Sequence, residues 1–565
     1  MRQPLAISQI TFMRIEDPDV IVVGAGLAGL VATHELVKAG RRVVVLDQEN
    51  RNNLGAQAFW SLGGLFFVDS PEQRRMGIRD SYELALQDWM GSAGFDRDRE
   101  DHWPRQWAQA YVRFAATEKR QYLRQLGLRV IPLVGWAERG AGSAIGHGNS
   151  VPRFHLTWGT GPEVVRVFRE PVLEGERRGS VEFGFRHRVD ELIVQGGAAV
   201  GVRGSVLEAC DGLARGRSSP RTVTGEFERR GRAVLVSSGG IGHNYELIRQ
   251  SWPPRLGKPP ETMIAGVPEH VDGRMLAITE AAGANVVNRD RMWHYVEGIH
   301  NWDPVWPRHA IRIIPGPSAM WFDANGDRLE PPNFPGFDTL RTLRRILSTS
   351  HDYSWFILTQ SIIEKEFALS GSEQNPDLTG KDMRLTASRV RPGAPAPIEA
   401  FKQNGVDFVV RDSLSDLVAG MNEIARGPQL DFGHIERQIV ARDLEVGHRY
   451  SKDAQLMAIN NARRYLGDRL RVAKPHRLLD PSHGPLIAVR LNICTRKTLG
   501  GVETDLHSRV MRPDGSPFHG LYAAGEVAGF GGGGVHGYNA LEGTFLGGCI
   551  FSGRVAGRAL AAHVA

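Results

Sequence analysis

The chain has 565 residues, of which 41% are hydrophobic and 23% charged, so it is long enough for a large buried core and for two domains. The net charge of +6 is scattered, with only short pairs such as Arg229-Arg230, a pattern that argues against nucleic-acid binding. The three cysteines lack metal-ligand spacing, no basic and apolar leader precedes Asp19, and no apolar run approaches the roughly 20 residues that span a bilayer. We therefore expect a cytoplasmic protein with no membrane span, metal site or nucleic-acid partner.

The first residues of predicted structure follow the order that a bound dinucleotide requires. An apolar strand is expected at residues 19–23, followed by Gly24, Gly26 and Gly29, and a second apolar run ends at Asp47. Gly24 makes a tight turn, Gly26 lets backbone amides approach a pyrophosphate, and Gly29 allows close packing of helix on strand. Asp47 is placed to accept a hydrogen bond from a ribose hydroxyl. The pattern predicts a flavin or nicotinamide cofactor.

Further elements follow along the chain. The periodicity predicts helices at 82–90 and 107–126, a loop at 135–161, strands at 181–185, 189–194, 199–206 and 233–237, a helix at 454–466, strands from 486, and a last helix ending near residue 562. Between 291 and 449 the composition changes to tryptophan, proline and short helical segments without glycine fingerprints. We interpret residues 291–449 as an inserted second domain.

Several separated motifs resemble one family. They are Gly24-Ala25-Gly26-Leu27-Ala28-Gly29, Ser238-Gly239-Gly240, Thr498-Leu499-Gly500-Gly501-Val502, Gly520-Leu521-Tyr522-Ala523-Ala524-Gly525-Glu526, and Gly543-Thr544-Phe545-Leu546-Gly547-Gly548. With these motifs the chain resembles FAD-dependent oxidoreductases of the fumarate reductase and succinate dehydrogenase flavoprotein type. Within that group it is most similar to the members that are like 3-ketosteroid dehydrogenases.

The resemblance implies an α/β fold with a Rossmann-like FAD domain of the glutathione-reductase type. Residues 1–290 and 450–565 would form this domain, and residues 291–449 an α+β capping domain that covers the substrate. By position, Glu526 would bind the ribitol, the backbone near Val189 the adenine, and residues 543–546 the pyrimidine side of the flavin. The implied FAD contacts are Gly24, Gly26, Leu27, Ala28, Gly29, Asp47, Gln48, Leu54, Gly55, Gln57, Ala58, Ser61, Gly63, Gly64, Val189, Ser238, Gly239, Gly525, Glu526, Gly543, Thr544, Phe545 and Leu546.

The chain also departs from parts of the family. Gln57 stands where covalently flavinylated members carry histidine, so we expect noncovalent FAD. Lys497 and Ala540 stand where dicarboxylate enzymes carry a histidine and an arginine. A guanidinium binds a carboxylate bidentately and alanine cannot, so fumarate and succinate are disfavoured as substrates.

Dehydrogenation of adjacent carbons needs a base, a donor to the carbonyl, and a hydride acceptor. Ketosteroid dehydrogenases use tyrosines for proton transfer and carbonyl polarisation, and Tyr538 lies at the family's tyrosine position. Its alternative role is packing with a locally bonded hydroxyl. His536 is a candidate proton relay or a loop-fixing residue, and His294 and Tyr295 are further candidates.

Two other polar groups could be catalytic, but structural roles are favoured for both. His155 follows Pro152-Arg153 in a segment that resembles one near the family's active site. His351-Asp352-Tyr353 interrupts a helical pattern in the insert. No serine-hydrolase elbow follows a predicted strand.

The leading hypothesis is an FAD-dependent dehydrogenase or reductase that acts on a carbon-carbon bond beside a ketone in a bulky, apolar, steroid-like small molecule. The electron acceptor is left open. One alternative is a soluble fumarate reductase-like or aspartate oxidase-like enzyme of small acids. A second is a flavoprotein that only binds a partner or transfers electrons to it.

Overall fold

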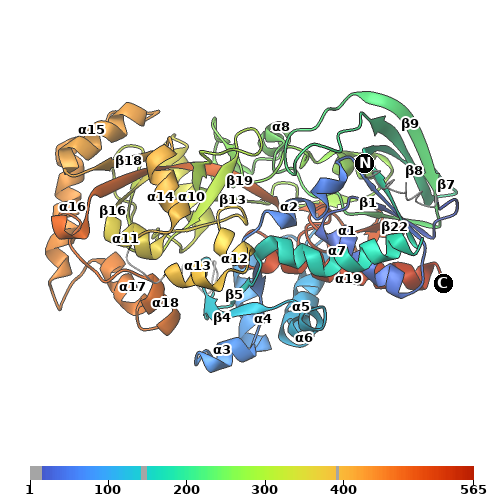
Figure 1. Cartoon of the computed structure of the whole chain (residues 1–565), viewed down its shortest axis with the longest axis horizontal. Coiled ribbons are helices and arrows are strands. Elements are labelled where there is room, and N and C mark those ends of the chain that lie inside the picture. The colour runs from blue at the N-terminus through green and yellow to red at the C-terminus, as the bar shows by residue number, and fades with distance from the viewer. Residues whose placement is uncertain (1–14, 141–148, 390–392) are drawn as a thin grey trace, which may run out of the picture.

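The computed structural model describes residues 15–140, 149–389 and 393–565, so most of the N-terminal extension and part of the loop predicted at 135–161 lie outside the described residues. The molecule is elongated, with a parallel sheet and the C-terminus toward one end and a second, larger sheet toward the other (Figure 1). The two sheets line opposite sides of one cavity.

The first sheet has the strand order β21-β22-β10-β1-β2-β6. Its strands are β1 (Val20–Val23), β2 (Val43–Asp47), β6 (Val181–Phe185), β10 (Ala233–Val236), β21 (Arg509–Met511) and β22 (Pro517–Ala523). All neighbours pair in parallel except β21, which is antiparallel to β22. Every residue of β1 is buried, as expected for a parallel strand covered on both faces. The sheet confirms the predicted α/β class.

Three helices pack close to this sheet. They are α1 (Leu27–Lys38), α7 (Thr160–Arg177) and α19 (Thr544–His563), and α1 contacts both of the others. Close approach of α19 to α1 depends on glycine: a Cβ at Gly553 would lie 2.5 Å from the Ala28 carbonyl oxygen. The two ends of the chain therefore build one unit.

Smaller elements surround the parallel sheet. An antiparallel sheet contains β7 (His187–Gln195), β8 (Ala198–Leu207) and β9 (Val223–Arg230), seen at the upper right of Figure 1. A second small sheet has the order β3-β5-β4, with β3 (Gly64–Phe66), β4 (Val130–Gly135) and β5 (Phe154–Thr157). Beside it lie α2 (Ala56–Phe59), α3 (Pro71–Arg75), α4 (Tyr82–Ala93), α5 (His102–Ala116) and α6 (Lys119–Gln125). Part of the predicted loop is therefore strand, because β5 bridges β3 and β4.

The second sheet has eight strands and follows the order β15-β16-β19-β13-β14-β17, with β11 and β18 also pairing with β19. The strands are β11 (Ile264–Ala265), β13 (Met292–His300), β14 (Ala310–Ile314), β15 (Met320–Asp323), β16 (Tyr353–Thr359), β17 (Ala368–Leu369), β18 (Phe408–Arg411) and β19 (Leu486–Thr498). A separate pair joins β12 (Val286–Val287) to β20 (Gly501–Val502).

Helices are most numerous around the second sheet. They include α10 (Thr339–Leu347), α11 (Gln360–Glu366), α12 (Pro376–Thr379), α13 (Met383–Ser388), α14 (Ala396–Asn404), α15 (Leu414–Ile424), α16 (Phe432–Val446), α17 (Ala454–Ala462) and α18 (Leu466–Arg471). Two further helices, α8 (Tyr245–Gln250) and α9 (Arg274–Ala281), lie earlier in the chain.

The second sheet extends beyond the predicted insert. The boundaries 291–449 remain a prediction, but β19 (Leu486–Thr498), expected in the returning FAD domain, lies at the centre of this sheet between β16 and β13. Tyr353, expected in a helical pattern, begins strand β16, whose seven residues are all buried. A short apolar run of this kind suits a buried strand and a buried helix equally well, and pairing with β19 decides in favour of the strand.

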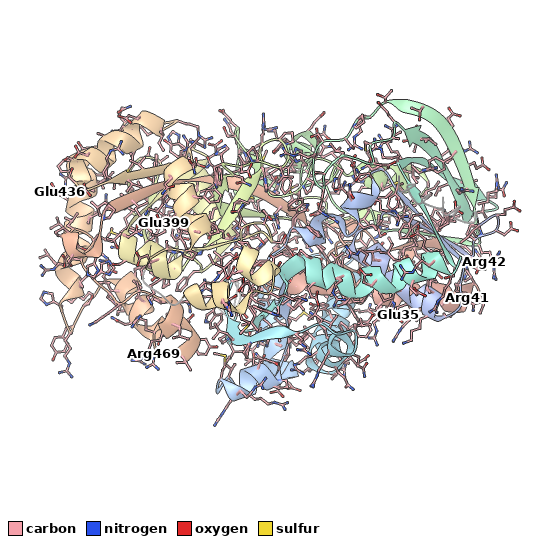
Figure 2. All side chains as sticks on the ribbon, in the orientation of Figure 1. Glu35, Arg41, Arg42, Glu399, Glu436 and Arg469 are labelled. Carbon is pink, nitrogen blue, oxygen red and sulfur yellow. The ribbon has the colours of Figure 1, made fainter. Side chains whose placement is uncertain are left out.

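Two further features concern membrane spans and surface charge. Among the described residues, no helix combines the length and hydrophobicity needed to cross a bilayer. Exposed basic side chains such as Arg42 and Arg469 lie at opposite ends of the molecule (Figure 2). Positive charge is thus spread over the surface.

Candidate active site

One cavity lies where the carboxyl ends of β1, β2 and β10 face strands β13 and β14. We call its lining from 23–64, 189, 237–239, 525–530 and 543–549 the floor, and the lining residues Tyr295, Arg312, Ile314, Ser370, Arg496 and Glu542 the roof. The cavity thus joins the glycine turns of the first sheet to polar side chains of the second.

The floor contains nearly all of the residues predicted to contact FAD. Of that set, only Gly29, Leu54 and Thr544 do not line the cavity. Gly29 instead has the packing role predicted for it, because a Cβ there would lie 2.1 Å from the Gly24 carbonyl oxygen. Val189 lines the cavity from β7, at a distance in sequence from the other floor residues.

The backbone of the floor fits a bound dinucleotide. Gly24 has a φ of +105°, and a Cβ there would lie 2.7 Å from the Ser237 carbonyl oxygen. A Cβ at Gly26, by contrast, would make only ordinary van der Waals contacts, the nearest to Ala56 Cβ at 3.7 Å, so packing within the protein does not require glycine there. Gly26 and Gly543 begin α1 and α19, and neither helix has a side-chain cap. Free amides at a helix N-terminus bind phosphates and other anions.

Asp47 lines the floor and is held by the backbone. Its carboxylate accepts hydrogen bonds from the amides of Ala25, at 2.7 Å, and Glu49, at 2.8 Å. Burial raises the pKa of Asp47, and these two hydrogen bonds oppose that rise. The carboxylate therefore fixes the glycine turn, and its contact with a ribose stays a prediction.

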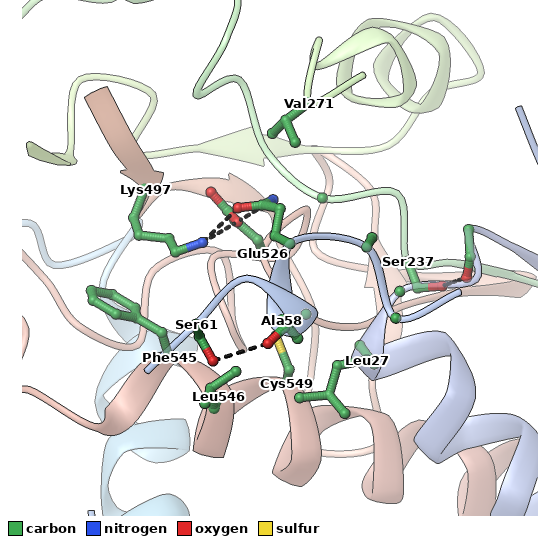
Figure 3. Close-up of a pocket in the computed structure, with 18 of the residues that line it drawn as sticks. Leu27, Ala58, Ser61, Ser237, Val271, Lys497, Glu526, Phe545, Leu546 and Cys549 are labelled. Carbon is green, nitrogen blue, oxygen red and sulfur yellow. Dashed lines mark hydrogen bonds and ion pairs between the residues drawn. The ribbon is translucent and has the colours of Figure 1, made fainter. Parts of the chain in front are cut away.

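A buried polar group connects the floor to β19 (Figure 3). Glu526 accepts hydrogen bonds from Gln57 Nε2 at 3.0 Å and from the Thr498 amide at 3.0 Å, and its Oε2 lies 3.3 Å from Lys497 Nζ. Lys497 also donates to Gln57 Oε1 at 2.6 Å. Burial lowers the pKa of Lys497 although Glu526 opposes the change. The lysine thus balances the charge of Glu526, and the carboxamide of Gln57 offers no imidazole for a covalent flavin link.

The centre of the roof is Arg312, a buried arginine of β14. It donates to Glu138 Oε1 at 2.6 Å and to Glu542 Oε1 at 2.7 Å, and its Nε lies 3.6 Å from Glu297 Oε2. Its guanidinium carbon lies 3.7 Å from the centre of the Tyr295 ring. All four partners are less than one tenth exposed. A guanidinium, three carboxyls and a phenol therefore share one buried group.

Burial and charge shift the pKa values of this group in a consistent direction. Burial raises the pKa of Glu138 well above its usual value, and it also raises the pKa of Glu297. Burial alone would lower the pKa of Arg312, but the surrounding acidic groups outweigh it and raise the value. Burial holds the pKa of Tyr295 well above its ordinary value, so its hydroxyl is a hydrogen-bond donor at neutral pH.

Of the four predicted catalytic residues, only Tyr295 lines the cavity. Tyr538 does not: its hydroxyl donates to Asp96 Oδ1 at 2.9 Å, and Arg255 and Arg291 lie against its ring. The turns after Gly525 carry the chain to α4, where the Tyr538 amide bonds to the Ala93 carbonyl. Position along the sequence suggested a place beside the flavin, and these turns direct the side chain elsewhere.

Both candidate histidines are buried outside the cavity lining. His536 is stacked on Trp89, and its Nε2 lies 2.9 Å from Thr544 Oγ1, at the first residue of α19. Burial lowers its pKa to about 3. His294 accepts from the Arg496 amide at 3.3 Å, and burial lowers its pKa to about 4. Both are neutral at pH 7, and the geometry supports the loop-fixing alternative for His536.

The two secondary candidates also have structural contacts. His155 lies on β5, with Nε2 2.7 Å from Ser70 Oγ and Nδ1 2.8 Å from the Arg153 carbonyl oxygen. Asp352 accepts from the Thr262 amide at 2.7 Å. Neither lines the cavity. Within the described ranges, no group of three or more His, Cys, Asp or Glu side chains could hold a metal ion.

Sequence reasoning missed the charged residues of the roof. Arg312 is the one charged residue of Ala310–Ile314, and Glu542 interrupts a glycine-rich apolar block. A lone charge within a buried apolar segment is a usable signal, because such a charge requires a partner. The sequence does not reveal which carboxyl groups pair with Arg312, since Glu138, Glu297 and Glu542 are far apart in sequence.

Comparison with known proteins identifies the family. The family described as "FAD binding domain" matches residues 19–546. A KsdD-like steroid dehydrogenase from Mycolicibacterium smegmatis is 64% identical over 550 residues, which cover 97% of this chain and 100% of that protein.

Solved structures share the fold. A 3-ketosteroid delta1-dehydrogenase from Sterolibacterium denitrificans, in complex with 1,4-androstadiene-3,17-dione, matches with a TM-score of 0.69 and 16% identity over 97% of this chain and 100% of that chain. A flavocytochrome c3 fumarate reductase matches with a TM-score of 0.62 and 19% identity over 97% and 79%. These likenesses confirm the predicted Rossmann-like FAD domain with a capping domain.

Proposed function

Because this chain belongs to the FAD binding domain family, we propose that it is an FAD-dependent dehydrogenase or reductase of a bulky, mostly apolar, steroid-like substrate. The bond that reacts is a carbon-carbon bond beside a ketone. The identity of 64% with a KsdD-like steroid dehydrogenase, over essentially the whole length of both proteins, supports this substrate class. The three cysteines have no disulfide partners among the described residues, which suits a cytoplasmic enzyme.

The observation that carries the proposal is the continuity of the cavity. The same space that is floored by the dinucleotide turns is roofed by Tyr295. Leu62, Phe154 and Ile314 add apolar surface to its lining. An apolar wall with a few placed polar groups is the usual form of a site for an apolar ligand.

FAD, when bound, supplies the acceptor or donor of a hydride. The residues of the chain supply the surroundings. The floor glycines orient the cofactor, and the uncapped amides of α19 place positive potential at its edge, where charge develops on reduction. Tyr295 keeps its proton and can donate a hydrogen bond to a substrate ketone.

The alternative of a small-acid enzyme is disfavoured by the partners of the nearby cations. Ala540 is fully buried and does not line the cavity. Arg312 is held by carboxylates, and Lys497 by Glu526 and Gln57. Neither Arg312 nor Lys497 is therefore available as an open fork for a carboxylate.

Anaerobic titration of the purified yellow protein tests the function. A panel of 3-ketosteroids should bleach the flavin, and C4-dicarboxylates should not. The reduced protein is then offered the corresponding unsaturated compounds, with fumarate as the matched control. Reoxidation by fumarate alone would overturn the substrate class. A protein that binds FAD but responds to neither panel would favour a role in binding or electron transfer.

A further inference from the structure

Three carboxyls surround a single guanidinium in the roof, and their charges do not balance. Glu138, Glu297 and Glu542 all lie within 3.6 Å of Arg312 nitrogen atoms. If all were ionised, the group would carry two uncompensated negative charges in a buried setting. Like charges that share one guanidinium disfavour joint ionisation, so this group favours binding of a proton.

Only one of the three carboxyls lines the cavity. Glu542 does so, whereas Glu138 and Glu297 lie behind Arg312 and are bonded to Thr339. Arg312 is bonded to Oε1 of Glu542, and no hydrogen bond to its Oε2 occurs within the described residues. Glu542 also immediately precedes Gly543, which begins α19. Its free oxygen therefore adjoins the part of the floor assigned to the flavin.

We infer that Glu542 is a catalytic residue that exchanges the substrate proton, and that Arg312 positions it. The inference rests on the proposed function. In dehydrogenation, the C–H bond beside the ketone breaks and its proton moves to Glu542 Oε2. The electron pair left behind forms the new C=C bond, while the hydride from the neighbouring carbon leaves to oxidised FAD. Reduction reverses each transfer.

The other members of the group fit this assignment. Arg312 cannot lose its proton, so it acts by holding Glu542 Oε1 and by stabilising the carboxylate after release. Tyr295 packs its ring on the Arg312 guanidinium, and its hydroxyl, which has no hydrogen bond within the described residues, can donate to the ketone oxygen. Carbonyl polarisation and proton removal are thus assigned to two different side chains of the roof.

Glu542→Gln tests the inference, because it keeps the shape and the acceptor for Arg312 but removes the base. The first readout is exchange of the protons beside the ketone of a bound 3-ketosteroid with D₂O, followed by mass spectrometry. FAD content and steroid binding are measured on the same samples, and anaerobic flavin bleaching gives the rate of the full half-reaction. We expect normal FAD content and binding, with exchange and bleaching slower by about 100-fold or more.

Glu373→Gln is the matched control, since Glu373 is a half-buried glutamate that does not line the cavity. It should exchange at the wild-type rate. Glu542→Asp is the second variant, because it retains a carboxyl one methylene further from the substrate. It should exchange at an intermediate rate even if Glu542→Gln folds poorly.

The outcomes separate the two proposals. Exchange at the wild-type rate in Glu542→Gln or in Glu542→Asp overturns the assignment of Glu542 alone. A wild-type protein that contains FAD but neither binds nor oxidises any ketosteroid overturns the proposed function and this inference with it.

Discussion

The floor and the roof of the cavity are built in opposite ways. The floor approaches its ligand with backbone, and glycines such as Gly24 and Gly26 leave room for that approach. The roof approaches with side chains, and Arg312 joins groups from three separate segments of the chain. One surface is defined by short motifs and the other by long-range pairing. The difference predicts that mutations will act by steric exclusion in the floor and by charge imbalance in the roof.

The largest effect is expected from a single methyl group in the floor. In Gly29→Ala the Cβ would lie 2.1 Å from the Gly24 carbonyl oxygen and 2.7 Å from Ser237 Oγ, so the turn must move. We expect loss of bound FAD and a lower midpoint of thermal unfolding, because overpacking of this kind costs about 1–3 kcal/mol or more. Flavin absorbance per chain measures the first effect. Gly212→Ala, where nothing lies within 4 Å, should retain full flavin; similar losses in both variants would contradict the steric argument.

The glycine motifs explain why the floor could be predicted from sequence. Particular residues at short spacing are required for a tight turn, a close backbone approach and an uncapped helix start. The roles of Gly24, Gly26 and Gly543 can therefore be predicted from their neighbours in the sequence.

The roof could not be predicted in this way. Arg312, Glu138 and Glu542 meet only after folding, and no local spacing relates them. Strand β19 pairs with β13 and β16, which are distant in sequence, so its apolar pattern alone does not say which sheet it joins. Tyr538 was assigned by position along the chain, and a single turn after Gly537 changes where such a side chain lies.

The second largest effect is a loss of folding stability, and it is expected from a change in the roof. Arg312→Met leaves three buried carboxyls without their cation, and breaking a buried ion pair costs about 3–5 kcal/mol. Urea unfolding of the FAD-loaded protein should show this loss at neutral pH. The matched control is Arg177→Met, since Arg177 pairs with Glu174 in an exposed position. That change should cost less than about 1 kcal/mol. Equal losses would mean that the roof charges are not effectively buried.

A third comparison separates the two tyrosines. Tyr295→Phe removes the hydroxyl that faces the cavity, and we expect turnover to fall by about 30-fold, equivalent to roughly 2 kcal/mol, a typical cost of leaving one partner without its hydrogen bond. Tyr538→Phe, which removes a hydroxyl bonded to exposed Asp96, should change turnover by less than about twofold. Steady-state rates with a 3-ketosteroid and an artificial electron acceptor measure both. The reverse ranking would restore the sequence-based assignment of Tyr538.

The smallest effect expected for a single residue is on the pH dependence of folding stability. It should be similar beside the floor and beside the roof, because it depends only on the burial of a histidine. His536, beside the floor, and His294, beside the roof, have their pKa values lowered by burial to about 3 and about 4. Below the unfolded value of about 6.5, the unfolded chain binds a proton that the folded protein does not, so stability falls as the pH decreases toward the folded pKa. At pH 5.5 the loss is about 1.4 kcal/mol for each histidine. His536→Gln and His294→Gln should each reduce the pH dependence of the unfolding free energy between pH 7 and 5 by about 0.7 of a proton on average, measured by urea unfolding across that range. A difference between the two slopes would show that acid acts through the roof charges and not through burial.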